Sequence, residues 1–359
     1  MRKLILNLHL YTALVAGLFV IILGITGSIL AFEDDLDRIS NQKLLYSEPK
    51  GKMISAVSAL DRLHGAYPGQ RIAVLRLPSR RDGVFIAAVR GVQVYLDAYS
   101  GEIHGTRSGV SLLQSIHNMH LRLMMGKPAG TFVGVVGIVI IFLVLSGIYL
   151  WWPLKRSTVK FGAPARRASF DIHNTVGIYS AAFLLILAIT GTAVAFDDTV
   201  FPWVYKVTNS TPPKRSAPST VQPGAPAITP DEALRAASDA LPGAAPIAVL
   251  LPPNPKGSFV IAMHFPEDLT PGGRSWVIID QYSGKALSVE SSRNPPAGTR
   301  VEIVNRAIHT GDIFGYPSKI LMSLASLMLV VQVITGYWMW WKKLRSGRET
   351  PQKAPAVAR

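Results

Sequence analysis

The sequence of 359 residues contains no cysteine. Disulfide bonds, thiolate catalysis, thiolate-bound metal clusters and the covalent attachment of c-type haem are therefore excluded. Any redox centre in this chain must use other ligands, and its 8 histidines are the first candidates.

Charged residues are also scarce, at 16% of the chain against 49% hydrophobic residues. Four runs carry no Asp, Glu, Lys or Arg and are long enough to cross a bilayer as helices: 4–32, 129–152, 172–196 and 320–341. The first run is too long for the apolar core of a signal peptide, and Ala31-Phe32-Glu33 is a poor cleavage site. We therefore expect four transmembrane helices.

Basic residues predict the orientation of these helices. The net charge of +15 comes from 37 Lys and Arg against 22 Asp and Glu, and many of the basic residues flank the spans. Arg2 and Lys3 precede the first span, the segment 154–170 is basic, and Lys342 and Lys343 follow the fourth. By the positive-inside rule both termini are cytoplasmic and the two long connections face outward. Contact with anionic lipid accounts for the charge, so no nucleic-acid partner is expected.

The chain repeats itself. An offset of 164 residues (173 − 9) superimposes the third span on the first, and an offset of 189 (309 − 120) superimposes the fourth on the second. The first offset matches His173 to His9 and Thr190-Gly191 to Thr26-Gly27; the second matches His309 to His120, Gly336 to Gly147 and Trp340-Trp341 to Trp151-Trp152. This pattern indicates a tandem duplication with a pseudo-twofold axis along the membrane normal.

The outward connections repeat as well. Each contains the motif Asp-x-Tyr-Ser-Gly, at 97–101 and 280–284, and each has a helical pattern before it, at 54–64 and 230–241. Alternating strands, such as 71–77 and 258–264, lie between helix and motif. The second helix has a predicted capping box, from Thr229 to Glu232. We expect two small α+β domains, each with one helix over an antiparallel sheet.

The expected fold class is therefore a membrane α-helical protein with four transmembrane helices and two α+β domains. The expected order of segments is span 1–32, domain 33–110, histidine-bearing helix 111–127, span 128–153, basic loop 154–170, span 171–196, linker 197–228, domain 229–300, histidine-bearing segment 301–316, span 317–342 and tail 343–359.

Four histidines form two predicted pairs, because the duplication places His9 and His173 at one depth and His120 and His309 at another. A histidine in or beside hydrocarbon is functional by default, and a symmetric pair can bind one planar metal cofactor from both faces. Structural zinc needs about four protein ligands, whereas haem b needs two axial nitrogens. The sequence predicts two bis-histidine haems b. The alternative is that each imidazole only hydrogen-bonds a neighbouring helix.

The outer pair has a second candidate ligand, His117. In Ile116-His117-Asn118-Met119-His120 the two histidines are three residues apart and share a helical face, which also includes Leu113 and Met124. The ungapped alignment of the second and fourth spans matches His309 to His120. Shifting this alignment by three residues matches His309 to His117 instead. His117 therefore stays a substitute ligand or a proton-handling group, and Met124 a weaker axial candidate.

Two axial histidines leave no open position on the iron, so electron transfer is expected rather than oxygen chemistry. No flavin or nicotinamide fingerprint occurs, so the electron donor would be a quinol or a cytoplasmic reductase. The glycines of the spans would leave room for a macrocycle, or simply let the helices pack closely.

Taken together and in their order along the chain, the motifs of this sequence resemble those of the PepSY-associated transmembrane family. This family includes iron-regulated FoxB-type siderophore reductases of the bacterial inner membrane. The matching pieces are the two span starts with histidine, the Asp-x-Tyr-Ser-Gly turns, Ile-His-Asn-Met-His, and the Trp-Trp span ends. The resemblance covers nearly the whole chain. It implies two PepSY-like periplasmic domains, haem b between the helices, and reduction of a ferric siderophore.

That reaction needs no catalytic acid, base or nucleophile, because adding an electron to ferric iron weakens its binding by hard oxygen ligands. Two other functions stay open at this point. One is a haem-free PepSY-type binding or regulatory protein, and the other is a transporter component for iron or its siderophore.

Overall fold

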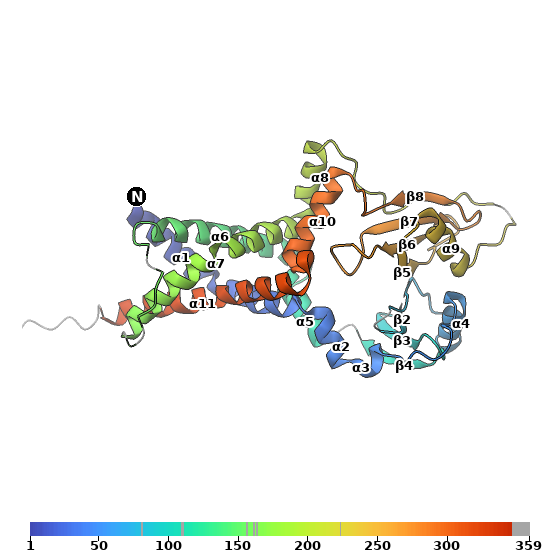
Figure 1. The fold of residues 1–359 in the computed structure, drawn as a ribbon, viewed down its shortest axis with the longest axis horizontal. Helices are drawn as coiled ribbons and strands as arrows, with labels where there is room; N and C mark the ends of the chain where they lie inside the picture. The colour runs from blue at the N-terminus through green and yellow to red at the C-terminus, as the bar shows by residue number, and fades with distance from the viewer. Residues whose placement is uncertain are drawn as a thin grey trace, which may run out of the picture. The chain divides into compact units, whose positions relative to one another are not determined.

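The computed structural model describes residues 1–79, 82–108, 111–155, 157–160, 162, 164–222 and 224–346. The chain divides into two compact units, shown in Figure 1. The membrane unit comprises Met1–Ala31, His117–Phe196 and Lys319–Arg359, and the sheet unit comprises Phe32–Ile116 and Asp197–Ser318. Arg156 of the expected basic loop and the expected tail beyond residue 346 lie outside the described residues.

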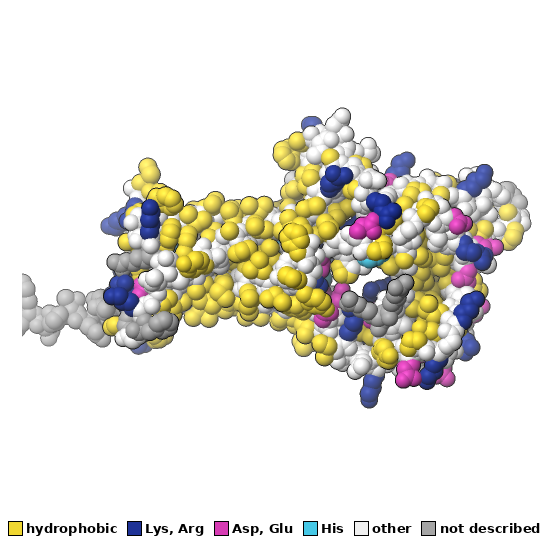
Figure 2. All heavy atoms as spheres, in the orientation of Figure 1, with side chains coloured by type: hydrophobic (Ala, Val, Ile, Leu, Met, Phe, Trp, Pro, Cys, Tyr) yellow, Lys and Arg dark blue, Asp and Glu magenta, His cyan; other side chains and the backbone are white. Residues whose placement is uncertain are grey.

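Four long helices form the membrane unit: α1 (Arg2–Leu30), α6 (Lys127–Trp151), α7 (Ala165–Ala195) and α11 (Tyr316–Ser346). Each is long and apolar enough to cross a membrane, which confirms the four spans expected from the sequence. Figure 2 shows apolar side chains along the sides of this unit and Lys and Arg side chains near the N-terminus. A short helix, α5 (Leu112–Arg122), precedes α6.

Small residues let these helices approach closely. An added Cβ on Gly17 would lie 2.7 Å from the Tyr337 ring, and one on Gly24 would lie 2.9 Å from the carbonyl oxygen of Ser326. The Ser326 hydroxyl donates to the carbonyl of Gly24 at 3.0 Å. Most glycines of the spans therefore serve helix packing, as is common between membrane helices, and only some border the histidines described below.

The sheet unit contains a single eight-stranded antiparallel sheet in the order β4-β3-β2-β1-β5-β6-β7-β8. The strands are β1 (Val74–Arg76), β2 (Val84–Val89), β3 (Val92–Asp97), β4 (Ile103–Ser108), β5 (Ala245–Leu250), β6 (Ser258–His264), β7 (Ser275–Asp280) and β8 (Ala286–Glu290). Pairing of β1 with β5 joins the two halves, with Leu75 opposite Val249. The sequence indicated two separate α+β domains, but the structure merges their sheets, and this pairing satisfies backbone groups that two open edges would expose.

One hydrophobic core also serves both halves. Helices α4 (Ala56–Ala66) and α9 (Pro230–Ala240) pack on this sheet, and their buried side chains belong to one cluster with strands from both halves. The predicted capping box between Thr229 and Glu232 is present at the start of α9. The carboxylate of Asp231 accepts hydrogen bonds from the backbone N–H groups of Ala56 and Val57, each at 2.9 Å. The first turn of α9 thus caps α4.

Replacing Asp231 by alanine should loosen the first turn of α4, because two of its N–H groups lose their charged acceptor. A lost cap costs about 1 kcal/mol. The amides of Ala56 and Val57 should then exchange hydrogen about five- to tenfold faster in mass-spectrometric exchange of the whole protein. Asp61→Ala, on the exposed side of the same helix, is the control. Unchanged exchange in Asp231→Ala would contradict the capping role.

The two Asp-x-Tyr-Ser-Gly motifs are structural turns between strands. Asp97 Oδ1 accepts from the N–H groups of Tyr99 (2.7 Å) and Ser100 (2.8 Å), and Asp280 repeats the arrangement with Tyr282 and Ser283. Both turns end in a glycine with positive φ, +73° at Gly101 and +67° at Gly284, a backbone conformation that favours glycine.

The remaining elements are α2 (Glu33–Ser40), α3 (Gln42–Leu45), α8 (Asp197–Val207), α10 (Ala297–Thr310) and the 3₁₀ turn η1 (Asp312–Phe314). Helix α8 occupies the first eleven residues of the expected linker. It is stabilised by α10: the Tyr205 hydroxyl donates to Glu302 at 2.8 Å, and Gly298 lies against the Tyr205 ring.

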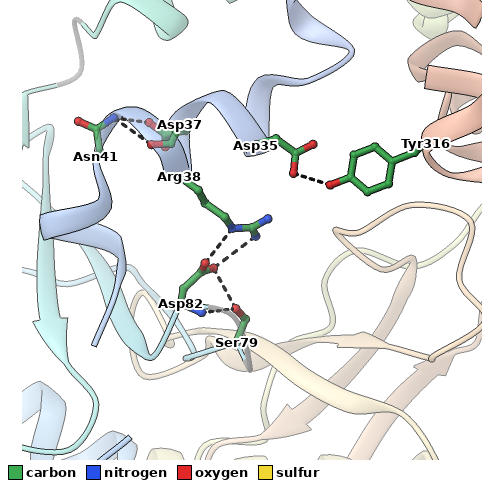
Figure 3. A network of polar contacts seen from close by, with 7 residues as sticks. All are labelled: Asp35, Asp37, Arg38, Asn41, Ser79, Asp82 and Tyr316. Atoms are coloured by element: carbon green, nitrogen blue, oxygen red, sulfur yellow. Dashed lines mark hydrogen bonds and ion pairs between the residues drawn. The ribbon is translucent and has the colours of Figure 1, made fainter. Parts of the chain in front are cut away.

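Polar contacts anchor α2 within the sheet unit (Figure 3). Arg38 Nε donates to Asp82 at 2.8 Å, and Asp82 also accepts from the Ser79 hydroxyl at 2.9 Å. The Tyr316 hydroxyl donates to Asp35 at 2.8 Å. These contacts fix the segment that follows the first span.

Candidate functional site

A cavity of about 1060 Å³ lies inside the membrane unit, at the end where α1 and α7 begin and α6 and α11 end. All four long helices line it, mostly with aliphatic and aromatic side chains. Cofactor and ligand sites usually measure about 300–1,000 Å³, so the cavity is large enough for a cofactor. Five basic residues, here called the basic rim, also border it: Arg2, Lys3, Arg166, Arg167 and Lys343.

His9 of α1 and His173 of α7 lie together in this cavity. Their ring centroids are 6.5 Å apart and the ring planes are nearly perpendicular, at 88°. Two imidazole nitrogens bound to opposite sides of one metal atom lie about 4 Å apart, and the ring centroids about 6 Å apart. The observed separation therefore suits one metal atom between the two rings.

A hydroxyl contacts the ring of His9. The Ser146 hydroxyl can donate to the carbonyl of Phe142, one helical turn earlier, at 2.7 Å. His9 Nδ1 lies 2.8 Å from the same oxygen, and when the hydroxyl donates to that carbonyl it accepts from Nδ1–H. Nε2 of His9 is then bare, which is the form in which an imidazole binds a metal.

His173 repeats this arrangement. The Thr335 hydroxyl donates to the carbonyl of Val331 at 2.7 Å and lies 2.9 Å from His173 Nδ1. Metal-binding histidines typically donate their other ring N–H to such an acceptor. Ser146 and Thr335 are separated by 189 residues, the offset already found for the second and fourth spans.

Glycine lies beside both rings. An added Cβ on Gly147 or on Gly336 would lie 3.6 Å from Cε1 of His9 or His173, respectively. The amide of Gln332 also donates to the backbone carbonyl of His173 at 3.1 Å. These contacts position the two imidazoles from the helices that face them.

The two histidines fit a planar metal cofactor whose macrocycle already supplies the other ligands of the metal. Within the described residues, no group of three or more His, Cys, Asp or Glu side chains could hold a bare metal ion. Zinc sites need three or four such ligands, whereas a macrocyclic metal complex needs two. Lys3 and Arg166 of the basic rim make no hydrogen bond or ion pair with the described part of the chain, so they can meet acidic groups of a ligand.

His120 has the same local environment as the inner pair. Its Nδ1 lies 2.9 Å from the Thr26 hydroxyl, which itself donates to the carbonyl of Ile22 at 2.6 Å. An added Cβ on Gly27 would lie 3.1 Å from His120 Cε1, so the ring packs closely on α1. The choice of His120 over His117 as the ligand stays a prediction.

Met124 does not share the face of His117 and His120, and that prediction is wrong. Helix α5 ends at Arg122, and both Leu123 (φ +47°) and Met124 (φ +60°) adopt left-handed backbone conformations. The chain therefore turns away from the helical path before Met124.

His309 lies on α10 of the sheet unit, and its pairing with His120 stays a prediction. Three further histidines belong to the sheet unit, and Nδ1 of one of them, His104, is buried without a hydrogen-bond partner among the described residues. His64 is exposed on α4, His104 Nε2 lies 3.2 Å from Asp97, and His264 ends β6.

The hydroxyl partners of the histidines were not identified from the sequence. Ser146 and Thr335 immediately precede Gly147 and Gly336, which the offset of 189 had already matched. A search for polar residues at matched positions within the apolar runs would have found them.

These features define a membrane-embedded helical protein with four spans and a histidine-bearing cavity. The sequence matches the family described as the PepSY-associated TM region over residues 6–343. The chain therefore belongs to this family, which confirms the resemblance seen in its motifs. Comparison with curated proteins finds no match.

Proposed function

We propose that the protein is a di-haem b ferric-siderophore reductase of the bacterial inner membrane. It would pass electrons from a quinol or a cytoplasmic reductase across the bilayer to ferric iron in the periplasm. The observation that carries this proposal is the pair His9 and His173, whose ring centroids are 6.5 Å apart in an apolar cavity and whose Nδ1 atoms are both held by hydroxyls.

His9 and His173 are the proposed axial ligands of the inner haem. Bound there, haem b would supply one-electron redox chemistry. By accepting from Nδ1–H, Ser146 and Thr335 would leave each Nε2 unprotonated as a ligand, and the largely apolar lining would contact the macrocycle. Lys3 and Arg166 would neutralise the two carboxylates of the macrocycle.

The outer haem is proposed from the duplication in the sequence. The two offsets make Thr190 and His309 the counterparts of Thr26 and His120. The Thr190 hydroxyl donates to the carbonyl of Ile186 at 2.7 Å, as Thr26 does to Ile22 at 2.6 Å. His120 and His309 are therefore the proposed outer ligands, related to the inner pair by parallel repeats about the membrane normal.

The topology belongs to the same proposal. Both termini and the basic rim would be cytoplasmic, and the sheet unit would be periplasmic and built from two PepSY-like halves. The substrate would be a ferric siderophore: one electron reduces Fe(III) to Fe(II), and the weaker hold of oxygen ligands on Fe(II) releases it. No side chain needs to act as an acid, base or nucleophile.

Removing either hydroxyl partner should weaken haem binding at the inner site. In Ser146→Ala or Thr335→Val, the histidine loses the acceptor that fixes its tautomer, and such partners are typically worth about 10–100-fold in metal affinity. Haem retention during dilution of the purified protein measures the effect. Ser180→Ala is a matched control, because the Ser180 hydroxyl makes the same intrahelical bond, to Val176 at 2.6 Å. Equal haem loss in all three variants would contradict the proposed role.

Proteoliposomes test the function as a whole. With a reductant enclosed and a ferric siderophore outside, Fe(II) should appear outside and be captured there by a ferrous chelator. A protein that binds no haem and gives no Fe(II) would fit the haem-free regulatory alternative, and net iron uptake without external Fe(II) would fit a transporter.

A further inference from the structure

We propose that the sheet unit carries a binding site for the anionic oxygen groups of a ferric chelate, centred on Arg274. Three arginines from separate segments gather there: Arg215 follows α8, Arg274 immediately precedes β7, and Arg306 lies on α10. Arg215 and Arg274 line one recess. The identity of the chelate rests on the proposed function, whereas the anion site itself does not.

The carboxylates near these arginines already have other partners. Glu302 accepts from the Tyr205 hydroxyl at 2.8 Å, and its second oxygen lies 3.9 Å from Arg215. Glu290 accepts from the backbone N–H of Lys214 at 3.2 Å. Neither carboxylate forms a hydrogen bond or ion pair with Arg274.

Arg274 makes no hydrogen bond or ion pair with any residue that the structure describes, although its side chain is half-buried. Burial, together with the nearby guanidinium groups of Arg306 and Arg215, lowers the pKa of Arg274. The carboxylates of Glu302 and Asp268 oppose this shift, and Asp268 already accepts from the backbone N–H of Phe265 and the Ser292 hydroxyl. A desolvated cation without a partner is unfavourable. A bound anion would remove that penalty, because a guanidinium donates charge-assisted hydrogen bonds to an anionic oxygen.

The recess admits only a small group. Its volume is about 20 Å³, which is enough for one oxygen-sized group. Arg306 is exposed and the Arg215 side chain is 52% exposed, so solvent reaches the cluster. Arg215 also lies over the Trp276 ring, 5.4 Å from its centroid, which holds its side chain in place. An anionic group can thus reach Arg274 while the body of the ligand stays outside.

The charge of the site selects among ferric chelates. Carboxylate and catecholate chelates of ferric iron are anionic and present oxygen groups at their surface, whereas a ferric trihydroxamate is neutral. In this cluster the guanidinium groups of Arg274 and Arg306 have no hydrogen bond or ion pair with the described residues, which favours the anionic class. Attraction between opposite charges also raises association rates, and this effect weakens as the salt concentration increases.

Titration of the oxidised, full-length protein in detergent with ferric citrate tests the site, with a neutral ferric trihydroxamate as the second probe. Arg274→Gln should weaken ferric citrate binding about tenfold or more and leave trihydroxamate binding within about twofold. Arg235→Gln, an exposed arginine on α9, is the control with the same change in charge and should bind both probes normally. Arg274→Lys keeps the charge without the planar fork and should bind citrate with intermediate affinity.

The inference is overturned if the unaltered protein does not bind ferric citrate, or if Arg274→Gln and Arg235→Gln weaken it equally. Thermal unfolding of each variant identifies a loss of binding that comes from misfolding, and in that case Arg306→Gln replaces Arg274→Gln under the same criteria. No electron transfer takes place in this assay. A protein without haem that still binds citrate through Arg274 would refute the reductase proposal and support the anion site.

Discussion

Replacement of His9 by alanine is expected to remove one of two haems from the purified protein. In the proposed inner site His9 and His173 are the two ligands, and their ring centroids are 6.5 Å apart, so one imidazole alone would leave the iron with a single protein bond. The haem content, measured as the pyridine haemochrome per chain, should fall by about half. His173→Ala should give the same result, because the two residues contribute equally to one centre.

His64→Ala is the control for this experiment, since His64 is exposed on α4 in the sheet unit. It should retain both haems. A His9→Ala protein with its full haem content would show that the inner cavity does not hold haem through this pair.

Exchange of His120 for alanine should abolish reduction of external ferric chelate in proteoliposomes, whereas His117→Ala should retain most of it. His120 Nδ1 lies 2.9 Å from the Thr26 hydroxyl, as His9 Nδ1 lies 2.8 Å from that of Ser146, and we propose that Nε2 of His120 is the ligand atom. Without the outer haem, electrons would have to cross most of a hydrocarbon core of about 30 Å without a carrier. The rate of external Fe(II) formation should fall by about two orders of magnitude or more.

The inner haem should remain in His120→Ala and still be reduced from the inside, which separates loss of the outer site from misfolding. If His117→Ala is inactive and His120→Ala is active, the ligand assignment is reversed and the alignment with a slip of three residues is correct.

The spans and the local elements were predictable because their signals are local. A charge-free run long enough to cross a bilayer gives a helix regardless of its neighbours, and all four such runs do so. The capping residues Thr229 and Glu232 correctly predicted the start of α9, and the alternation of apolar and polar residues correctly predicted β6 at Ser258–His264. Helix α7 begins before its apolar run and helix α11 ends after its apolar run. Outside the hydrocarbon, polar side chains can continue a helix without the cost of leaving water.

Features that depend on distant segments were not predictable in the same way. The pairing of β1 with β5 brings together residues near positions 75 and 249, and nothing in either short strand specifies its partner. Helix α8 contains Pro202 and was interpreted as linker, because its stability comes from the packing of Tyr205 on α10. Met124 was placed on the histidine face because the sequence carries no signal that α5 ends at Arg122.

For the candidate site, the sequence predicted the inner histidines and the structure shows the groups that surround them. Symmetry alone paired His9 with His173, and the structure places their rings together. Serine and threonine in apolar runs are common, so Ser146 and Thr335 did not stand out as partners. Their role becomes visible only in the structure, which places each hydroxyl beside the Nδ1 atom of a histidine.

Electron paramagnetic resonance of the oxidised, purified protein tests the central claim most directly, because it reports the axial ligands of each ferric haem. We predict two low-spin signals of bis-histidine haem, one of which disappears in His173→Ala. A high-spin ferric signal alone, or a protein without haem after expression with ample haem supply, would contradict the assignment of His9 and His173 as the two ligands of one iron.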